Sequence, residues 1–344
     1  MPVAPGGTAG ARRVALRLSA ALLAWTVASL AVTGWDWQDR WTTPGREVLH
    51  FLRLWLFWLS AAFPLALAAV AALGLYCTTR RARILCLLLA LALAAGSWAR
   101  LAEPEMLRVR ETVLRGAPAP AEPVRIALVA DLHQGLFGRD HQLRRLVRRL
   151  NELGVDAVFF AGDWTNEPRR DLATGFAPLR DLRVPAFAVL GNHDTGAPGP
   201  PVAGALRQAL QAHGVQVIEG RRIRWKGWEL VGLADLWGGS PRGQIRSLRG
   251  PHPPRLVLAH QPDTYAFLPP GSAFLAMAGH THGGQIRLPW LTDQVLRNLT
   301  RNAWWDGLYD TPAGRLYVTP GTGMIGLPMR LGVPPTIDVI SLLR

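Results

Sequence analysis

The stretch Gly279-His280-Thr281-His282-Gly283-Gly284 places two histidines, one residue apart, among three glycines. Glycine lets the backbone turn sharply and approach other groups closely, so both imidazole rings can face one metal ion. The motif is short, and its meaning depends on the residues that precede it in the chain.

Four shorter blocks of metal-ligand or acid–base residues precede this stretch, each directly after a short apolar run. They are Asp131-Leu132-His133, Gly162-Asp163, Gly191-Asn192-His193-Asp194 and Ala259-His260. Such apolar runs are typical of buried strands. Open α/β sheets place their sites beyond the carboxyl ends of the strands, so we expect the blocks to meet at one edge.

The part of the chain from residue 124 alternates strand and helix patterns. Buried strands are predicted at 124–130, 157–161 and 186–190, and an amphipathic helix at 143–153. This alternation predicts βαβ units and a largely parallel sheet. A hairpin is expected at 222–225 and 228–233, and further strands at 256–259, 274–278, 316–319 and 337–342. These later strands would form a second sheet that faces the first, with helices outside.

Seven side chains in these blocks are candidate metal ligands. They are Asp131, His133, Asp163, Asn192, His260, His280 and His282. Oxygen and imidazole ligands without sulfur suit Mn, Fe or Zn better than Mg or Ca, and we expect Mn first. Seven ligands exceed the needs of one tetrahedral ion. If Asp163, in the middle of the order, is shared, two divalent ions would lie about 3.5–4 Å apart, a spacing that serves phosphoryl chemistry.

The ordered blocks resemble the calcineurin-like metallophosphoesterase family, whose pattern is Asp-x-His, Gly-Asp, Gly-Asn-His-Asp/Glu, a further His and Gly-His-x-His. Each block matches residue by residue. The stretches at 282–289 and 331–335 are similar to the YkuE/YaeI-type, membrane-associated branch. The resemblance covers residues 124–344 and leaves the N-terminal region outside.

The resemblance implies an αββα sandwich with a dinuclear centre. One ion would be held by Asp131, His133, Asp163 and His282, the other by Asp163, Asn192, His260 and His280. A hydroxide bridging the ions would attack phosphorus in line. His193 would protonate the leaving oxygen, with Asp194 orienting its ring.

The expected activity is hydrolysis of a phosphoester or pyrophosphate bond in a phosphorylated small molecule or lipid, such as a cell-envelope precursor. Two alternatives remain: a nucleotide or cyclic-nucleotide phosphodiesterase, and a metal-loaded membrane sensor without turnover. The intact His193 argues against the sensor, because a binding module does not need a spare acid.

The first hundred residues contain three apolar segments, at 18–35, 54–77 and 84–99. A bilayer span takes about 20 apolar residues, and about 17 at the low end. We therefore expect a membrane anchor of three helices at 1–101. Residues 102–123, rich in Pro and Ala, are expected to be a linker, and 124–344 the catalytic domain.

Arginine placement predicts the orientation of the anchor in the inner membrane. Arg12, Arg13 and Arg17 precede the first segment, and Arg80, Arg81 and Arg83 precede the third. By the positive-inside tendency both groups are cytoplasmic, which sends the catalytic domain to the external, periplasmic face. Arginines in the first loop and after the last segment oppose this bias and weaken it.

The net charge of +14 comes almost wholly from arginine, because Lys226 is the one lysine. Such a charge favours anionic lipids or phosphorylated substrates. The arginines at 144–149 lack interleaved aromatic residues, so we expect a solvated helix face and no specific nucleic-acid partner. Both cysteines, Cys77 and Cys86, lie in or beside apolar segments, which leaves no thiolate metal site for the soluble part.

Several other features have a plainer interpretation. Four histidines lack a glycine or strand-end context and are taken as surface or packing residues: His50, His141, His213 and His252. Asp235 is expected in a turn. The apolar, tryptophan-rich segment 289–309 is either a lid resting on the bilayer or a cover over the second sheet.

Overall fold

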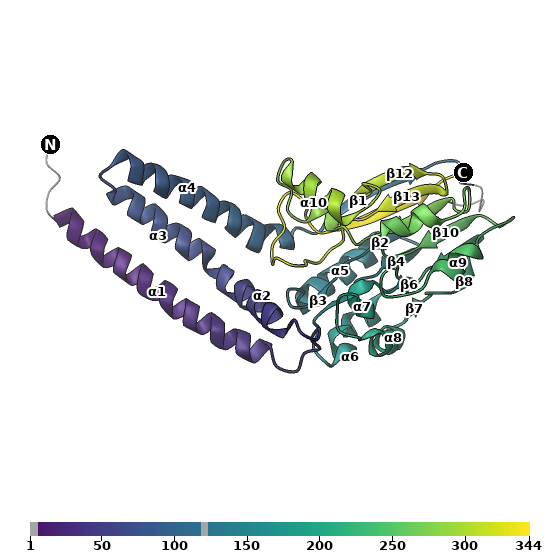
Figure 1. The fold of residues 1–344 in the computed structure, drawn as a ribbon, viewed down its shortest axis with the longest axis horizontal. Coiled ribbons are helices and arrows are strands. Elements are labelled where there is room, and N and C mark those ends of the chain that lie inside the picture. Colours follow the sequence, from purple (N-terminus) through teal and green to yellow (C-terminus); the bar gives the residue numbers. More distant parts are fainter. Residues whose placement is uncertain (1–5, 118–122) are drawn as a thin grey trace.

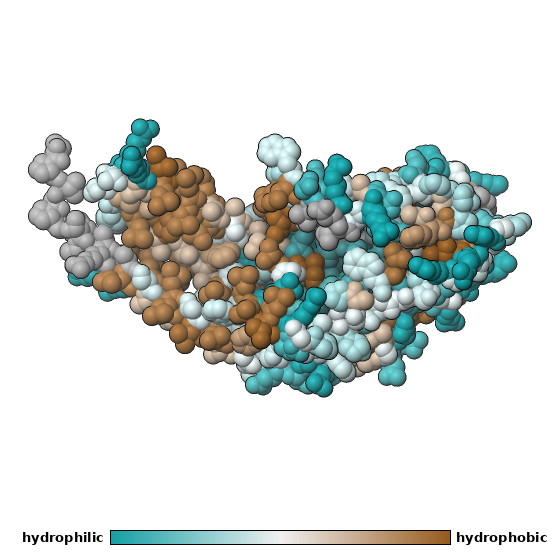
Figure 2. Space-filling view, viewed as in Figure 1, coloured by the Kyte–Doolittle hydropathy of each residue, from teal (hydrophilic) through white to brown (hydrophobic). Residues whose placement is uncertain are grey.

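The computed structural model describes residues 6–117 and 123–344. Figure 1 shows an elongated bundle of helices at the N-terminal end, followed by a domain of two sheets with helices around them. Figure 2 shows that the bundle is mostly hydrophobic on its surface, whereas the domain is mostly hydrophilic. This difference matches the split in composition near residue 100.

Helices form most of the N-terminal region. They are α1 (Gly6–Asp36), α2 (Glu47–Leu59), η1 (Ser60–Ala62), α3 (Phe63–Tyr76), α4 (Arg80–Ser97), η2 (Trp98–Ala102) and η3 (Glu103–Glu105). By length and composition, three stretches can cross a membrane: Leu16–Asp36, Glu47–Tyr76 and Arg80–Glu105. The second is one helical path through α2, η1 and α3. We call α1 to η3 the anchor.

The first sheet has the strand order β1-β14-β2-β4-β6-β7. Its strands are β1 (Arg108–Leu114), β2 (Val124–Val129), β4 (Ala157–Ala161), β6 (Ala186–Val189), β7 (Val215–Val217) and β14 (Thr336–Leu342). From β2 to β7 the neighbours are parallel, as the βαβ pattern predicted, and β14 runs antiparallel to β2. Both faces of this sheet are buried.

The second sheet has the order β12-β13-β11-β10-β9-β8. Its strands are β8 (Arg222–Trp225), β9 (Trp228–Gly232), β10 (Arg255–Leu258), β11 (Leu275–Ala278), β12 (Gly307–Thr311) and β13 (Gly314–Val318). The expected hairpin is β8 and β9, paired antiparallel. The pairs β9–β10, β10–β11 and β11–β13 are parallel, so their carboxyl ends share one edge.

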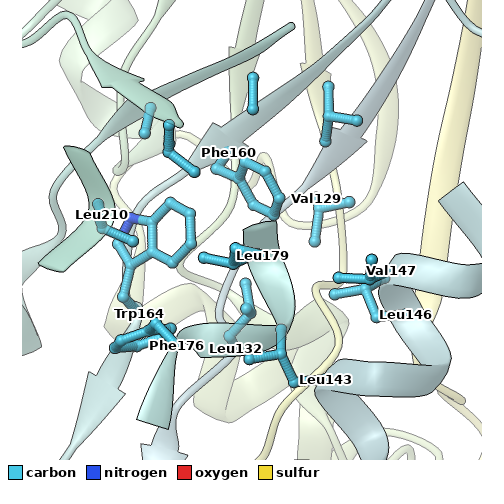
Figure 3. Close-up of a cluster of buried hydrophobic side chains, with 14 of the residues drawn as sticks. Val129, Leu132, Leu143, Leu146, Val147, Phe160, Trp164, Phe176, Leu179 and Leu210 are labelled. Atoms are coloured by element: carbon cyan, nitrogen blue, oxygen red, sulfur yellow. The ribbon is translucent and has the colours of Figure 1, made fainter. Parts of the chain in front are cut away.

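Three hydrophobic clusters build the layers. One lies on the outer face of the first sheet, where Leu143 and Leu146 of α5 (Asp140–Glu152) meet Phe160 and Trp164 (Figure 3). A second joins the two sheets. It includes Ile126, Phe159 and Ile340 from the first sheet and Trp228, Leu256 and Met277 from the second. A third covers the outer face of the second sheet. The result is the expected αββα sandwich.

Short elements complete the domain and carry most of its loops. They are β3 (Gln134–Gly135), β5 (Thr165–Asn166), α6 (Leu172–Gly175), η4 (Ala177–Asp181), α7 (Asn192–Thr195), α8 (Ala203–Ala212), α9 (Arg242–Arg246), η5 (Pro262–Phe267), η6 (His282–Gly284) and α10 (Leu291–Leu299).

One expectation needs correction. Residues 337–342 were assigned to the second sheet, but β14 lies in the first, between β1 and β2. A buried strand is apolar on both faces, so its pattern does not reveal which sheet it joins. The expected linker also contains a strand, β1, which pairs with β14. Its alternation of charged and apolar residues suits a half-exposed edge strand. The division into anchor, linker and domain stays a prediction.

The anchor packs directly on the domain. Leu54 and Phe57 of α2 share a buried cluster with Leu136, Phe137 and Met324 of the domain. Polar contacts surround this cluster. The buried Asp36 at the end of α1 pairs with Arg40, Arg139 and Arg169. The two units therefore meet through both apolar and charged contacts.

We expect Ile340→Ala to destabilise the domain by about 2–5 kcal/mol, because Ile340 is fully buried between the sheets and its removal leaves a cavity. Chemical denaturation of the full chain in detergent, followed by tryptophan fluorescence, measures the effect. Leu308→Ala, at a position 43% exposed on β12, is the control and should change stability by about 0.5 kcal/mol or less. Equal effects would show that β14 is not a core strand.

Candidate metal centre

The metal-ligand blocks lie at the carboxyl ends of strands from both sheets. Asp131 follows β2, Asp163 follows β4 and Asn192 follows β6, while His260 and His280 follow β10 and β11. Five candidate ligands have the left-handed backbone that non-glycine residues rarely adopt. These are Asp131, His133, Asp163, His280 and His282. Such strain is typical of functional sites, where it is held in place by the surrounding packing.

Two glycines of the motifs are required by close approach. A Cβ on Gly191 would lie 2.1 Å from Oδ1 of Asp163, and one on Gly279 would lie 2.6 Å from Oδ2 of Asp131. Neither glycine has a positive φ. Their role is therefore to let two carboxylates enter the site, rather than to allow a special turn.

The first group of ligand atoms comes from Asp131, His133 and His282, whose ligand atoms lie within 4.8 Å of one another. The Nε2 atoms of His133 and His282 are 3.0 Å apart. Oδ1 of Asp131 lies 3.6 Å from Nε2 of His282, and Oδ2 of Asp163 lies 3.6 Å from Nε2 of His133.

The second group comes from Asp163, His260 and His280. Nε2 of His260 is 3.2 Å from Oδ2 of Asp163 and 3.1 Å from Nδ1 of His280. The amide oxygen of Asn192 is 3.1 Å from the same Nε2. Oδ2 of Asp163 thus faces both groups, and all seven predicted ligands are brought together.

Three imidazoles in the two groups are neutral, the form in which a ring nitrogen can bind a metal ion. Burial lowers the pKa of His133 and of His280 to about 3, and holds that of His282 well below its usual value. The 3.0 Å contact between Nε2 of His133 and Nε2 of His282 requires either an N–H on one ring or a cation beside the two lone pairs. Divalent cations fit this arrangement.

The pKa values of the two carboxylates also indicate a site for cations. Burial raises the pKa of Asp131 to about 7, and the charge of Asp163 adds to the shift. The pKa of Asp163 is well below its usual value, because the nearby histidines outweigh its burial. A bound dication would stabilise both carboxylates in the charged form. The donor set of oxygen, imidazole and amide suits Mn, Fe or Zn.

His193 lies beside the ligands without joining either group. Its ring is edge-on to that of His133, with 5.1 Å between ring centroids. The ring is half-buried, and burial lowers its pKa. Its backbone N–H donates to Oδ1 of Asp163 at 3.0 Å. The ring is thus available for a role other than coordination.

Asp194 does not orient the His193 ring within the described residues. Its carboxylate accepts hydrogen bonds from the backbone N–H groups of Trp164, Thr165 and Gly191, and from the Thr165 hydroxyl. Adjacent residues of a helical turn point in different directions, so the two side chains separate. Asp194 instead ties the Asp163 loop to the Asn192 loop.

Sequence reasoning missed several residues around the site. Backbone carbonyls of Ala161 and Thr165 lie 2.7 Å and 3.3 Å from the Nδ1 atoms of His260 and His133. Such contacts fix ring orientation. The half-exposed Trp237 lies against the His280 ring, with centroids 4.7 Å apart. No spacing in the sequence marks these contacts.

Arg330 is a further missed residue, fully buried beneath His282. It donates to the carbonyls of Gly323, Pro320 and Val333, and its Nη2 lies 3.5 Å from Nδ1 of His282. Asp235 behaves as expected, since its carboxylate accepts from the backbone of Trp237 and Gly238 in a turn.

Glu167 links the anchor to this site. It is buried, four residues beyond Asp163, and accepts from the backbone N–H of Thr43 at 2.7 Å and from the Thr43 hydroxyl. Nδ1 of His50, on α2, lies 3.0 Å from its carboxylate. His50 is therefore a buried, paired residue at the junction. By contrast, His141 is exposed and contacts Glu105.

Residues 124–284 match the calcineurin-like phosphoesterase family. This part of the chain is thus a calcineurin-like phosphoesterase domain, and a region of apolar helices precedes it.

Three relatives illustrate the match. The uncharacterized metallophosphoesterase YkuE of Bacillus subtilis is 29% identical over 272 residues, covering 73% of this chain and 92% of the relative. Phosphodiesterase YaeI of Escherichia coli is 28% identical, covering 64% of this chain and 83% of the relative. The UDP-2,3-diacylglucosamine pyrophosphatase LpxG of Chlamydia muridarum is 24% identical, covering 66% and 86%.

We expect metal binding to release protons at neutral pH. Although burial lowers it, the Asp163 carboxylate raises the pKa of His260 to about 10, so metal-free His260 is protonated at pH 7. Its Nε2 must lose that proton to bind a cation, and affinity should therefore rise as pH approaches 10. Calorimetric titration with Mn²⁺ in Pipes and in Tris measures the release.

The control for this titration is His252→Gln, distant from both groups in the described contacts, which should release protons as the wild type does. A binding enthalpy that is the same in both buffers would contradict the prediction.

Proposed function

We propose that this chain is a membrane-anchored, dinuclear-metal hydrolase that cleaves a phosphoester or pyrophosphate bond in a lipid or cell-envelope precursor. The observation that carries the proposal is the convergence of two ligand groups on Asp163, whose Oδ2 faces both. A single shared carboxylate is the simplest way to hold two cations close together.

Each ion would have four protein ligands. One ion would be held by Asp131, His133, Asp163 and His282. The other would be held by Asp163, Asn192, His260 and His280. Cations held by these residues would supply an acidified water as nucleophile and would offset charge on the phosphoryl oxygens. We expect Mn²⁺ first, with Fe or Zn as alternatives.

The protein's own contribution to chemistry is proton transfer and positioning. His193 would give a proton to the leaving oxygen, because its half-buried ring is free of both groups. An anionic phosphate beside the ring favours its protonated form. Asp194 would act on position, by tying together the loops that carry Asp163 and Asn192.

The contact between the anchor and the site is an argument for a substrate that resides in a membrane. Thr43 and His50 of the anchor bind Glu167, which lies on the same loop as Asp163. The site is thus tied to the bilayer end of the domain. LpxG, a relative, is named for a pyrophosphate substrate that carries acyl chains. We propose the same class of substrate here.

We also propose that the anchor is multi-pass in the inner membrane, with the domain on the external face. The arginines at 80–83 and the start of α1 lie at the end of the bundle opposite the domain (Figure 1). Cytoplasmic arginines at that end put the domain outside.

A nucleotide or cyclic-nucleotide phosphodiesterase is the second candidate, because the relative YaeI is named a phosphodiesterase and nucleotides are one class of phosphodiester. Comparing nucleotide diesters with lipid pyrophosphates as substrates separates the two. A metal-loaded sensor without turnover would hold metal tightly and cleave neither.

We expect Asp163→Ala to lower hydrolysis of an aryl phosphate ester by at least about a hundredfold, because both cations lose a ligand. Asn192→Ala should also reduce the rate strongly. Both are measured with full-length protein in detergent with Mn²⁺. Asp171→Ala, at an exposed helix cap, is the matched control. Equal rates in wild type and Asp163→Ala would defeat the proposal.

The role of His193 predicts a dependence on the leaving group. His193→Gln should slow hydrolysis of an alkyl ester by about 10²–10⁴, the usual contribution of a positioned acid. A nitrophenyl ester, whose leaving group needs no proton, should lose much less. Equal losses with the two esters would show that His193 acts through structure or binding instead.

A further inference from the structure

The segment that leads into α10 exposes four consecutive apolar residues. These are Leu288, Pro289, Trp290 and Leu291, which we call the apolar tip. Trp290 is 88% exposed and Leu291 59% exposed. Exposed runs of this length destabilise a protein in water and normally serve a function. The remainder of the tryptophan-rich segment differs, because Trp304 packs against the cluster on the second sheet.

The tip is continuous with the anchor through a short chain of backbone contacts. Arg330 donates its N–H to the carbonyl of Ala99, at the end of the third span, at 2.9 Å. The backbone N–H of Leu331 donates to the carbonyl of Gln285. The backbone N–H of Arg287 in turn donates to the carbonyl of Leu331 at 2.7 Å. Leu288 follows directly. Two exposed apolar side chains, Trp98 and Leu327, lie along this path.

This continuity places the tip near the membrane surface. Trp98 is half-exposed at the domain end of the third span, where tryptophan favours the interface between lipid and water. Figure 1 shows α10 on the side of the domain that faces the anchor. Figure 2 shows hydrophobic surface on that side, next to the hydrophobic bundle.

The geometry points to a second membrane contact: we propose that the apolar tip inserts into the interface of the bilayer that holds the anchor. A lipid surface is the occupant favoured by position, because the anchor fixes the domain beside it. A surface helix or loop with Trp and Leu typically buries its apolar side about 5–10 Å into the interface.

The tip also contacts the metal-ligand turn through α10. Thr292 and Leu296 are buried, and a Cβ on Gly284 would meet them at 2.5 Å and 3.2 Å. Gly284 belongs to η6, the turn that starts at His282. Insertion of the tip would therefore hold the bilayer within one packing layer of a candidate ligand. The contact with lipid does not depend on the proposed reaction.

Fluorescence quenching tests this proposal in the full chain. In a Cys77→Ala, Cys86→Ala background, Leu291→Cys is labelled with nitrobenzoxadiazole and placed in nanodiscs of phosphatidylcholine and phosphatidylglycerol. Nanodiscs with and without doxyl-labelled phosphatidylcholine are compared. We expect the doxyl lipid to remove most of the emission. Phe267→Cys, at an exposed apolar site on η5, is the control and should keep its emission.

Quenching of the tip label equal to that of the Phe267→Cys control would overturn the proposal. A label that is protected from water yet unquenched by doxyl lipid would also overturn it, and would indicate a protein partner or a second copy. Adding Trp290→Ser should reduce the quenching of Leu291→Cys. An unchanged metal content shows that this variant is folded. None of these readouts needs turnover, so loss of the proposed hydrolase activity would leave the result intact.

Discussion

Convergence of polar side chains from the carboxyl ends of strands in both sheets is the constraint on which the site depends. Imidazole nitrogens lie about 3 Å apart in both groups, and buried carboxylates stand among them. Burial disfavours the charged form of the carboxylates, so such an arrangement is costly without a compensating positive charge. Left-handed backbone at five ligands adds to that cost. The proposed cation pair at Asp163 would offset the electrostatic part of this cost.

The fold meets this constraint by combining two sheets. Asp131, Asp163 and Asn192 come from the first, whereas His260 and His280 come from the second. The apolar layer between the sheets sets how closely these groups approach. The anchor then adds a third support, because Glu167, on the Asp163 loop, is bound by Thr43 and His50. The N-terminal helices, the packing between the sheets and the ligand geometry are thus physically connected.

The convergence of the seven candidate ligands could be predicted from sequence because each block follows a short apolar run, and parallel strands bring such ends together. The role of Asp194 could not, because neighbouring residues in α7 point apart and only coordinates reveal it. The sheet to which β14 belongs could not be predicted either, since its residues are buried on both faces. Arg330, Glu167 and His50 act across long sequence distances, for which no local pattern exists.

The most direct test of the account is the metal content of the full chain after reconstitution with Mn²⁺ and removal of free ions, measured by elemental analysis. The account predicts two ions per chain in the wild type and the loss of both in Asp163→Ala, because each site needs that carboxylate. A wild-type chain that retains no transition metal, or an Asp163→Ala chain that retains two ions, would contradict it.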